Sequence, residues 1–230
     1  MKYYSLHYAT SKIGRGGFPQ AQDIEMEAGK KVTDPDFVWN LKGDTLPNFN
    51  PYIGTLILRD GSAATDFISS AIISTGFVCS DKALSIIKQF SFGNTYFYEL
   101  GIKHKGLLYD KYKLIHCLNN YAVKIDYENS VFKRLKVENN KKVGEPYIVH
   151  NLEEVLMIKK EFSKNKYGDW CYLEPFTIRF KEEFKPIHDI FIIWGVTYKT
   201  YISESLRNVF DKSKITGIQY DFDGEHTDFI

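Results

Sequence analysis

The chain has 230 residues, of which 43% are hydrophobic and 16% aromatic, and its 30 basic and 29 acidic residues leave a formal net charge of +1. The hydrophobic content excludes a disordered chain, and the balanced charge argues against a nucleic-acid or membrane-surface protein, since such proteins usually carry clustered positive charge. The aromatic content favours a core rich in β-strands.

The cysteines and the first residues indicate the compartment. Cys79, Cys117 and Cys171 are too widely spaced for the CxxC motif of a zinc or redox site. Cys79 and Cys117 lie in apolar runs and are expected to be buried. The sequence begins without the apolar run of a signal peptide, and no stretch reaches the roughly 18 apolar residues of a transmembrane helix. We therefore expect a cytoplasmic protein with no membrane or nucleic-acid partner.

The first 75 residues predict few regular elements. Residues 2–8 alternate like an opening strand, whereas residues 14–50 are rich in Gly, Pro, Asp and Asn and are expected to be irregular, anchored by Val38 and Trp39. A strand is expected over residues 52–58, and residues 65–73 fit either a short helix or a buried strand. We expect residues 1–75 to pack as an irregular region on residues 76–230, an α+β domain, in one compact unit.

A strand–helix–strand pattern occurs twice, and its copies, beginning at Val78 and Tyr201, are 123 residues apart. Each copy has a β-prone stretch, a serine, an acid and apolar residues at helical spacing. Ser80 and Ser203 are predicted N-caps, because a serine hydroxyl can accept a bond from an unpaired N–H of the first helical turn. A turn and a second β-prone stretch follow each helix. The pattern predicts a repeated scaffold rather than a repeated functional site.

Residues between the two copies predict mainly strands. A strand is expected over residues 95–100. A β-hairpin or meander is expected after it, with strands over residues 112–118, 121–127 and 131–137, followed by a polar loop over residues 138–145.

A helix and two further strands are expected next. Asn151 and Glu154 resemble a capping box that starts a helix. Residues 170–180 indicate a strand interrupted by Pro175, and residues 188–196 a central strand buried on both faces. The whole pattern predicts an α+β fold of mostly antiparallel strands, with three or four short helices and two strand–helix–strand modules.

Motifs that carry chemistry are missing from the sequence. The glycine-rich residues 14–17 lack the Lys-Ser/Thr ending and the flanking elements of a phosphate loop. The six histidines show no HExxH spacing, and Ser62 and Ser80 lack a GxSxG context. We therefore expect no enzymatic activity, no cofactor and no metal.

The acidic residues of the C-terminal stretch do not match the calcium-binding loop pattern, and a solvated acidic tail is the simplest interpretation. The functional alternative is an acidic edge that meets a basic partner. On that alternative the candidate contact residues are Asp221, Asp223, Glu225 and Asp228.

Three segments in fixed order resemble a known family. These are the ending from Asp189 through residues 201–206 and 215–220, the serine-capped helix at residues 78–87, and the hairpin in which Asp126 and Ser130 occupy matching places. They resemble immunity proteins of bacterial polymorphic toxin systems, of the immunity protein 11 and immunity protein 43 type, which overlap a domain of unknown function numbered 1629. The resemblance covers residues 76–222, and Tyr220 replaces the usual phenylalanine.

The resemblance implies a non-catalytic, stoichiometric inhibitor that binds and neutralises a cognate, co-encoded protein toxin inside the producing cell. Acidic residues could then cover a basic surface of the toxin. Two alternatives stay open: a non-enzymatic α+β scaffold or interaction module of another bacterial pathway, and an enzyme whose site is assembled from distant residues.

Overall fold

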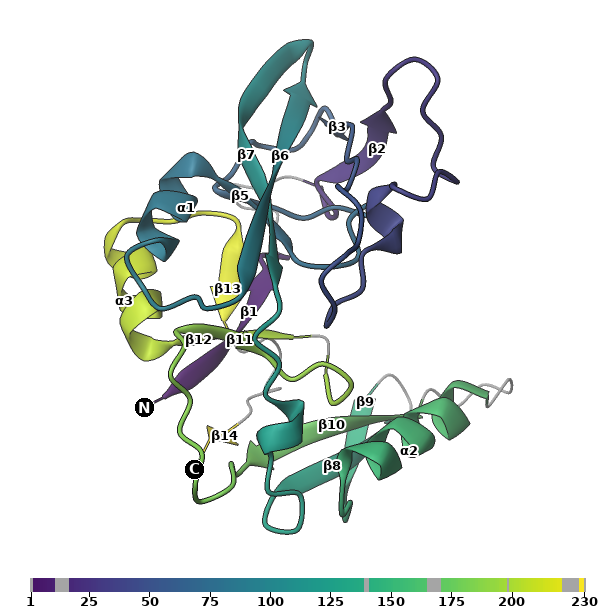
Figure 1. Cartoon of the computed structure of the whole chain (residues 1–230), viewed down its shortest axis with the longest axis vertical. Coiled ribbons are helices and arrows are strands. Elements are labelled where there is room, and N and C mark those ends of the chain that lie inside the picture. The colour runs from purple at the N-terminus through teal and green to yellow at the C-terminus, as the bar shows by residue number, and fades with distance from the viewer. Residues whose placement is uncertain are drawn as a thin grey trace.

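The computed structural model describes residues 2–10, 17–138, 141–164, 171–197, 199–220 and 228–229. Strands form most of the regular structure in these residues, together with three α-helices. The fold class is therefore α+β with strands dominant, as the sequence predicts. Figure 1 shows α1 and α3 side by side on one flank of the molecule and α2 lying along the sheet at the opposite end from β2 and β3.

The elements follow one another along the chain with these bounds: β1 (Tyr3–Tyr8), β2 (Ala21–Glu25), the 3-10 helix η1 (Val38–Asn40), β3 (Thr55–Leu58), β4 (Phe67–Ile68), β5 (Phe77–Ser80), α1 (Asp81–Ile87), β6 (Thr95–His104), β7 (Leu107–Cys117), the 3-10 helix η2 (Ala122–Lys124), β8 (Val131–Glu138), β9 (Lys141–Tyr147), α2 (Leu152–Lys164), β10 (Cys171–Ile178), β11 (Ile190–Ile192), β12 (Thr200–Ser203), α3 (Glu204–Lys212), β13 (Ile218–Tyr220) and β14 (Asp228–Phe229).

The strands form three sheets. The largest has the order β2-β3-β6-β7-β5-β4, a second has the order β11-β12-β1-β13, and a third has the order β14-β10-β8-β9. All pairings in these sheets are antiparallel except those of β3 with β6 and of β10 with β14. Antiparallel pairing suits a chain whose consecutive strands are joined by short turns, such as the Lys105–Gly106 turn, where both residues have positive φ.

Helices α1 and α3 begin at the serines that the sequence predicts. Ser80 accepts a hydrogen bond from the Ala83 N–H at 3.3 Å, and Ser203 accepts one from the Leu206 N–H at 3.2 Å. An acid, Asp81 or Glu204, follows each cap and suits the positive end of the helix dipole. Their apolar faces meet in one core cluster with the strands of the first two sheets.

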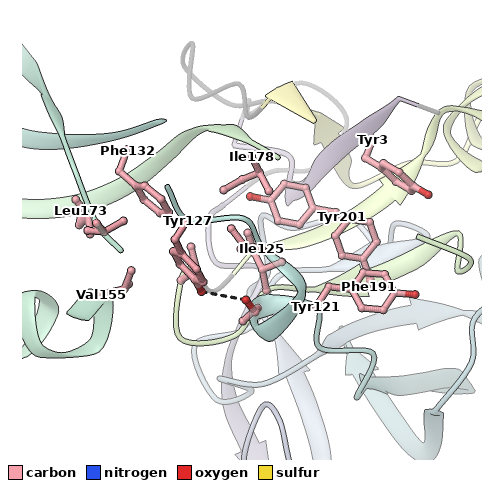
Figure 2. Close-up of a cluster of buried hydrophobic side chains, with 14 of the residues drawn as sticks. Tyr3, Tyr121, Ile125, Tyr127, Phe132, Val155, Leu173, Ile178, Phe191 and Tyr201 are labelled. Carbon is pink, nitrogen blue, oxygen red and sulfur yellow. Dashed lines mark hydrogen bonds between the residues drawn. The ribbon is translucent and has the colours of Figure 1, made fainter. Parts of the chain in front are cut away.

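Helix α2 covers the third sheet. Asn151 caps it by accepting the Glu154 N–H at 2.8 Å, and the Glu154 carboxylate accepts the His150 N–H at 2.7 Å. Val155 and Ile158 of this helix pack against Phe132 and Leu173 in a second core cluster. Figure 2 shows this cluster running from α2 to Tyr3, Phe191 and Tyr201 of the second sheet, and the Tyr127 hydroxyl donating to the Ala122 carbonyl at 3.0 Å. The cluster therefore joins the second and third sheets.

Three sequence-based expectations are wrong. Residues 121–127 contain the short helix η2 rather than a strand, because Tyr121 and Tyr127 turn into the core and end the alternation. Residues 138–145 are expected to form a polar loop, but β8 extends to Glu138 and β9 begins at Lys141 and pairs with it. The strand β11 is shorter than predicted and lies at a sheet edge; it is buried on both faces because Phe191 packs in one cluster and Ile190 and Ile192 in the other.

The first 75 residues contribute strands to two sheets. β1 pairs with β12 and β13, while β2 and β3 extend the six-stranded sheet from β6. Within residues 14–50, Phe37 and Val38 are buried, whereas Trp39 is 51% exposed and donates its indole N–H to the Ile72 carbonyl at 2.7 Å. The boundary at residue 76 stays a prediction; strands on both sides of it pair with one another.

Candidate functional site

The six-stranded sheet carries a cleft where β2, β3, β6 and β7 lie side by side. Glu25 pairs with Thr55, and Thr55 pairs with Gly101. Since directly paired residues project from the same face of a sheet, these three form a row across three strands. Gly101 has no side chain, and a Cβ there would lie 3.2 Å from the Thr55 Oγ1. A cleft of about 530 Å³ opens over this row.

The segment between β2 and β3 forms the outer wall of the cleft. The Glu27 N–H donates to the Tyr52 hydroxyl at 2.6 Å, and the Tyr52 N–H donates to the Asp36 carbonyl at 2.8 Å. The Lys30 ammonium donates to the Asp36 carboxylate at 2.6 Å and lies 4.9 Å from the centre of the Tyr52 ring. The hydrogen bond to Asp36 raises the pKa of Lys30. Four connected residues thus fix the wall.

Carboxylates dominate the lining. Five acids line it together with Lys30, and Lys103 and Lys113 pair with two of these acids from outside the lining, so two negative charges remain in excess; the acids are Glu25, Glu27, Asp36, Glu99 and Asp110. Three of the carboxylates have a basic partner, since Glu25 pairs with Lys103 at 2.7 Å and Glu99 pairs with Lys113, in addition to Asp36 with Lys30. In the part of the chain that the structure describes, no basic side chain pairs with Glu27 or Asp110.

The lining of the cleft also includes a few apolar residues. Ile53 and Leu100 are almost completely buried, so they present little apolar surface to a partner. A lysine or arginine side chain of a partner can place its charged end against the carboxylates at the rim. The exposed carboxylates of Glu27 and Asp110 therefore suit a basic segment of another protein.

A second hollow of about 550 Å³ lies between β1, the start of β5 and residues 197–200. Its lining is mainly apolar and aromatic, with Tyr8, Phe67 and Phe77 among its walls. Glu174 and Lys199 form an ion pair at its side, with 3.4 Å between the Lys199 Nζ and the Glu174 Oε2. This hollow therefore has no excess of acidic charge that would favour a basic partner.

The acidic residues predicted as contacts are not among the described residues that line the acidic cleft. Asp221, Asp223 and Glu225 lie outside the described residues. Asp228 begins β14, and its backbone pairs with Thr177 of β10. The structure therefore does not test these four as a binding surface.

No pattern in the sequence predicts the residues that line the cleft. Glu25 and Asp110 are far apart in the chain and line the same cleft only through the pairing of β2, β3, β6 and β7. That register cannot be read from the residues of any one strand. Glu27 and Asp36 belong to a segment that the sequence predicts only as irregular.

The cysteines Cys79 and Cys117 are buried free thiols, as predicted. Burial raises the pKa of both thiols, so neither forms a reactive thiolate readily at neutral pH.

Comparisons with protein families and with curated proteins give no relative. No protein-family model matches the chain, and no curated protein is significantly similar to it. Among the described residues, no group of three or more His, Cys, Asp or Glu side chains is arranged to hold a metal ion. No helix in the same ranges combines the length and the apolar character needed to cross a membrane.

Proposed function

We propose that this chain is an immunity protein, a non-catalytic inhibitor that binds and neutralises a cognate, co-encoded bacterial toxin in the cytoplasm of the producing cell. Its framework would be the two strand–helix–strand modules around Ser80 and Ser203. The motif order along residues 76–222 supports this reading. The acidic cleft is the observation that carries it, because a toxin that acts on nucleic acid presents a basic surface that such a cleft complements.

Charge in the cleft would act mainly on association. The rim carboxylates are exposed to solvent, so each ion pair with a partner contributes little affinity by itself. Several together steer a basic surface towards the cleft, and the effect weakens as salt screens it.

Co-expression with a toxin tests the proposal. The toxin is the protein encoded directly upstream of this chain, and the readouts are cell survival and a one-to-one complex of the purified pair. Wild-type chain should rescue the cells. If the neighbouring toxin kills equally well with the chain present, the immunity proposal is wrong, and a scaffold of another pathway becomes the better reading.

A pair of charge-reversal variants tests the cleft separately. Glu27→Lys with Asp110→Lys should weaken the complex, most strongly at low salt, and reduce rescue. The matched control is Glu153→Lys with Glu161→Lys, which makes the same charge change on the exposed face of α2, a helix that packs on the third sheet. Rescue that survives the cleft variant unchanged would move the toxin contact away from the cleft while leaving the immunity function standing.

A further inference from the structure

We infer that the chain contains an internal pseudo-dimer, two copies of one unit packed through an interface in which each copy makes the same contact to the other. The first unit consists of β4, β5, α1, β6 and β7. The second unit consists of β11, β12, α3, β13 and β1. This inference concerns an interaction surface and its partner, a second copy of the same unit, and does not depend on the proposed function.

The strand registers of the two units agree at one offset. Phe67 pairs with Cys79 in the first unit, and Ile190 pairs with Ile202 in the second. Adding 123 to the residue numbers of the first pair gives those of the second. The same offset relates Phe77, which pairs with Ile115, to Thr200, which pairs with Leu6. Helices α1 and α3 begin at positions related by the same offset.

The strand at the centre of each unit comes from a different part of the chain. β7 pairs with β5 on one side and β6 on the other, and β1 pairs with β12 on one side and β13 on the other. The strand orders β4-β5-β7-β6 and β11-β12-β1-β13 therefore correspond. In the first unit the central strand follows β6 through a hairpin, whereas in the second it precedes the whole unit. The second unit is thus a permuted copy.

In each unit an aspartate accepts hydrogen bonds from the serine that caps the helix. The Ser80 hydroxyl donates to the Asp66 Oδ1 at 2.9 Å, and the Ser203 hydroxyl donates to the Asp189 Oδ1 at 2.5 Å. Each serine also donates its N–H to the carbonyl of the same aspartate, at 2.7 Å for Ser80 and 2.9 Å for Ser203. Both aspartates precede their serine by the same number of residues.

The second oxygen of each aspartate binds the other unit. The Asp66 Oδ2 accepts the Thr216 N–H at 3.0 Å and the Thr216 hydroxyl at 2.9 Å, just beyond the end of α3. The Asp189 Oδ2 accepts the Ser91 N–H at 2.9 Å, just beyond the end of α1. Each unit therefore supplies a carboxylate and receives one. Thr216 and Ser91 are 125 residues apart rather than 123, so the two bridges correspond in place but not residue for residue. The reciprocity is that of an approximate isologous interface, the usual arrangement between two identical subunits.

Apolar contacts repeat the relationship. Phe67 of the first unit packs against Phe210 of the second. The positions related to them by the offset, Ile190 and Ile87, lie in the same core cluster. Helices α1 and α3 also contact each other directly. The interface thus has an apolar centre with an aspartate bridge on each side.

Hydrogen–deuterium exchange of the full-length chain tests the inference. Asp66→Asn should speed exchange about tenfold both at the start of α1 and at residues 213–217 of the other unit, because a charge-assisted hydrogen bond is lost at each. Asp189→Asn should do the same at the start of α3 and at residues 88–92. The matched control is Asp81→Asn, an exposed acid in the first turn of α1, which should leave residues 213–217 unchanged.

A milder variant guards against loss of folding. Thr216→Val removes only the hydroxyl donor to Asp66, and it should still speed exchange at the start of α1 in the first unit. Changes confined to the substituted unit, for Thr216→Val and for both aspartate variants, would overturn the reciprocal interface. Changes that cross between the units in both directions would support it.

Discussion

Phe67 and Phe210 meet edge to face, with ring centroids 5.7 Å apart and an angle of 69° between their planes. The first ring belongs to β4 and the second to α3, and both are almost completely buried. The contact joins residues from distant parts of the chain at the centre of one core cluster. Aromatic pairs in this geometry contribute beyond the area that they bury.

Phe210→Ala should lower the free energy of unfolding by roughly 3–5 kcal/mol, because it removes a fully buried ring and leaves a cavity against Phe67. Urea denaturation followed by circular dichroism measures the change. Asn208→Ala, an exposed position of the same helix, is the control and should stay within about 0.5 kcal/mol of wild type. Equal midpoints for Phe210→Ala and wild type would contradict the core assignment.

Ser203→Ala should lower the free energy of unfolding by on the order of 1–2 kcal/mol. The hydroxyl caps α3 and also donates to Asp189, and the loss of both bonds places the cost towards the upper part of the range for caps. Ser205→Ala, at an exposed position in the first turn of the helix, provides the comparison. A smaller loss for Ser203→Ala than for Ser205→Ala in thermal melts would show that the cap contributes little.

Gly217→Ala should destabilise the chain far more than Gly106→Ala. Both glycines have positive φ, so each substitution costs roughly 1–2 kcal/mol in backbone strain. At Gly217 a Cβ would also lie 2.1 Å from the Phe67 carbonyl oxygen, whereas nothing lies within 4 Å at Gly106. Chemical denaturation of the two variants measures the difference, and equal losses would rule out the close approach at Gly217.

Stability should fall in mild acid partly through His116. Its Nε2 hydrogen-bonds the Lys42 carbonyl at 2.8 Å, its buried Nδ1 has no hydrogen-bond partner among the described residues, and burial lowers its pKa. As pH falls below about 6.5, the unfolded chain takes up a proton that the folded chain resists, so the free energy of unfolding decreases. The loss continues until the pH passes the lowered pKa of the folded state.

His116→Gln isolates that contribution, because glutamine can still donate to Lys42 but does not titrate. Between pH 7.5 and 5.5 the variant should lose less stability than wild type in urea denaturation. Burial lowers the pKa of His188 as well, so His188→Gln is measured in parallel. Equal pH dependence of wild type and His116→Gln would contradict the assignment.

Local chemistry predicts the helix starts but not the sheets. Ser80, Ser203 and Asn151 cap their helices as expected, because a cap depends on residues within one turn. The alternation over residues 121–127 was misleading, since burial of Tyr121 and Tyr127 outweighs strand propensity there. β9 was missed because an edge strand with one exposed side needs few apolar residues.

The candidate site depends on information that no local pattern holds. Glu25, Glu99 and Asp110 lie in strands whose register is set by pairing across the sheet. The sequence favours acids near the C-terminus as contacts because they are clustered there. The acids of the cleft come from separate strands, so their clustering can be predicted only once the pairing of those strands is known.

The position of β1 between β12 and β13 has a consequence for synthesis of the protein. Leu6 leaves the ribosome long before Thr200 and Tyr220, its two partners, are made. At about 5–20 residues per second the delay is roughly 10–40 s. During that time Tyr3 and Leu6 must stay unpaired and accessible, so the second unit closes only after nearly all of the described chain has emerged.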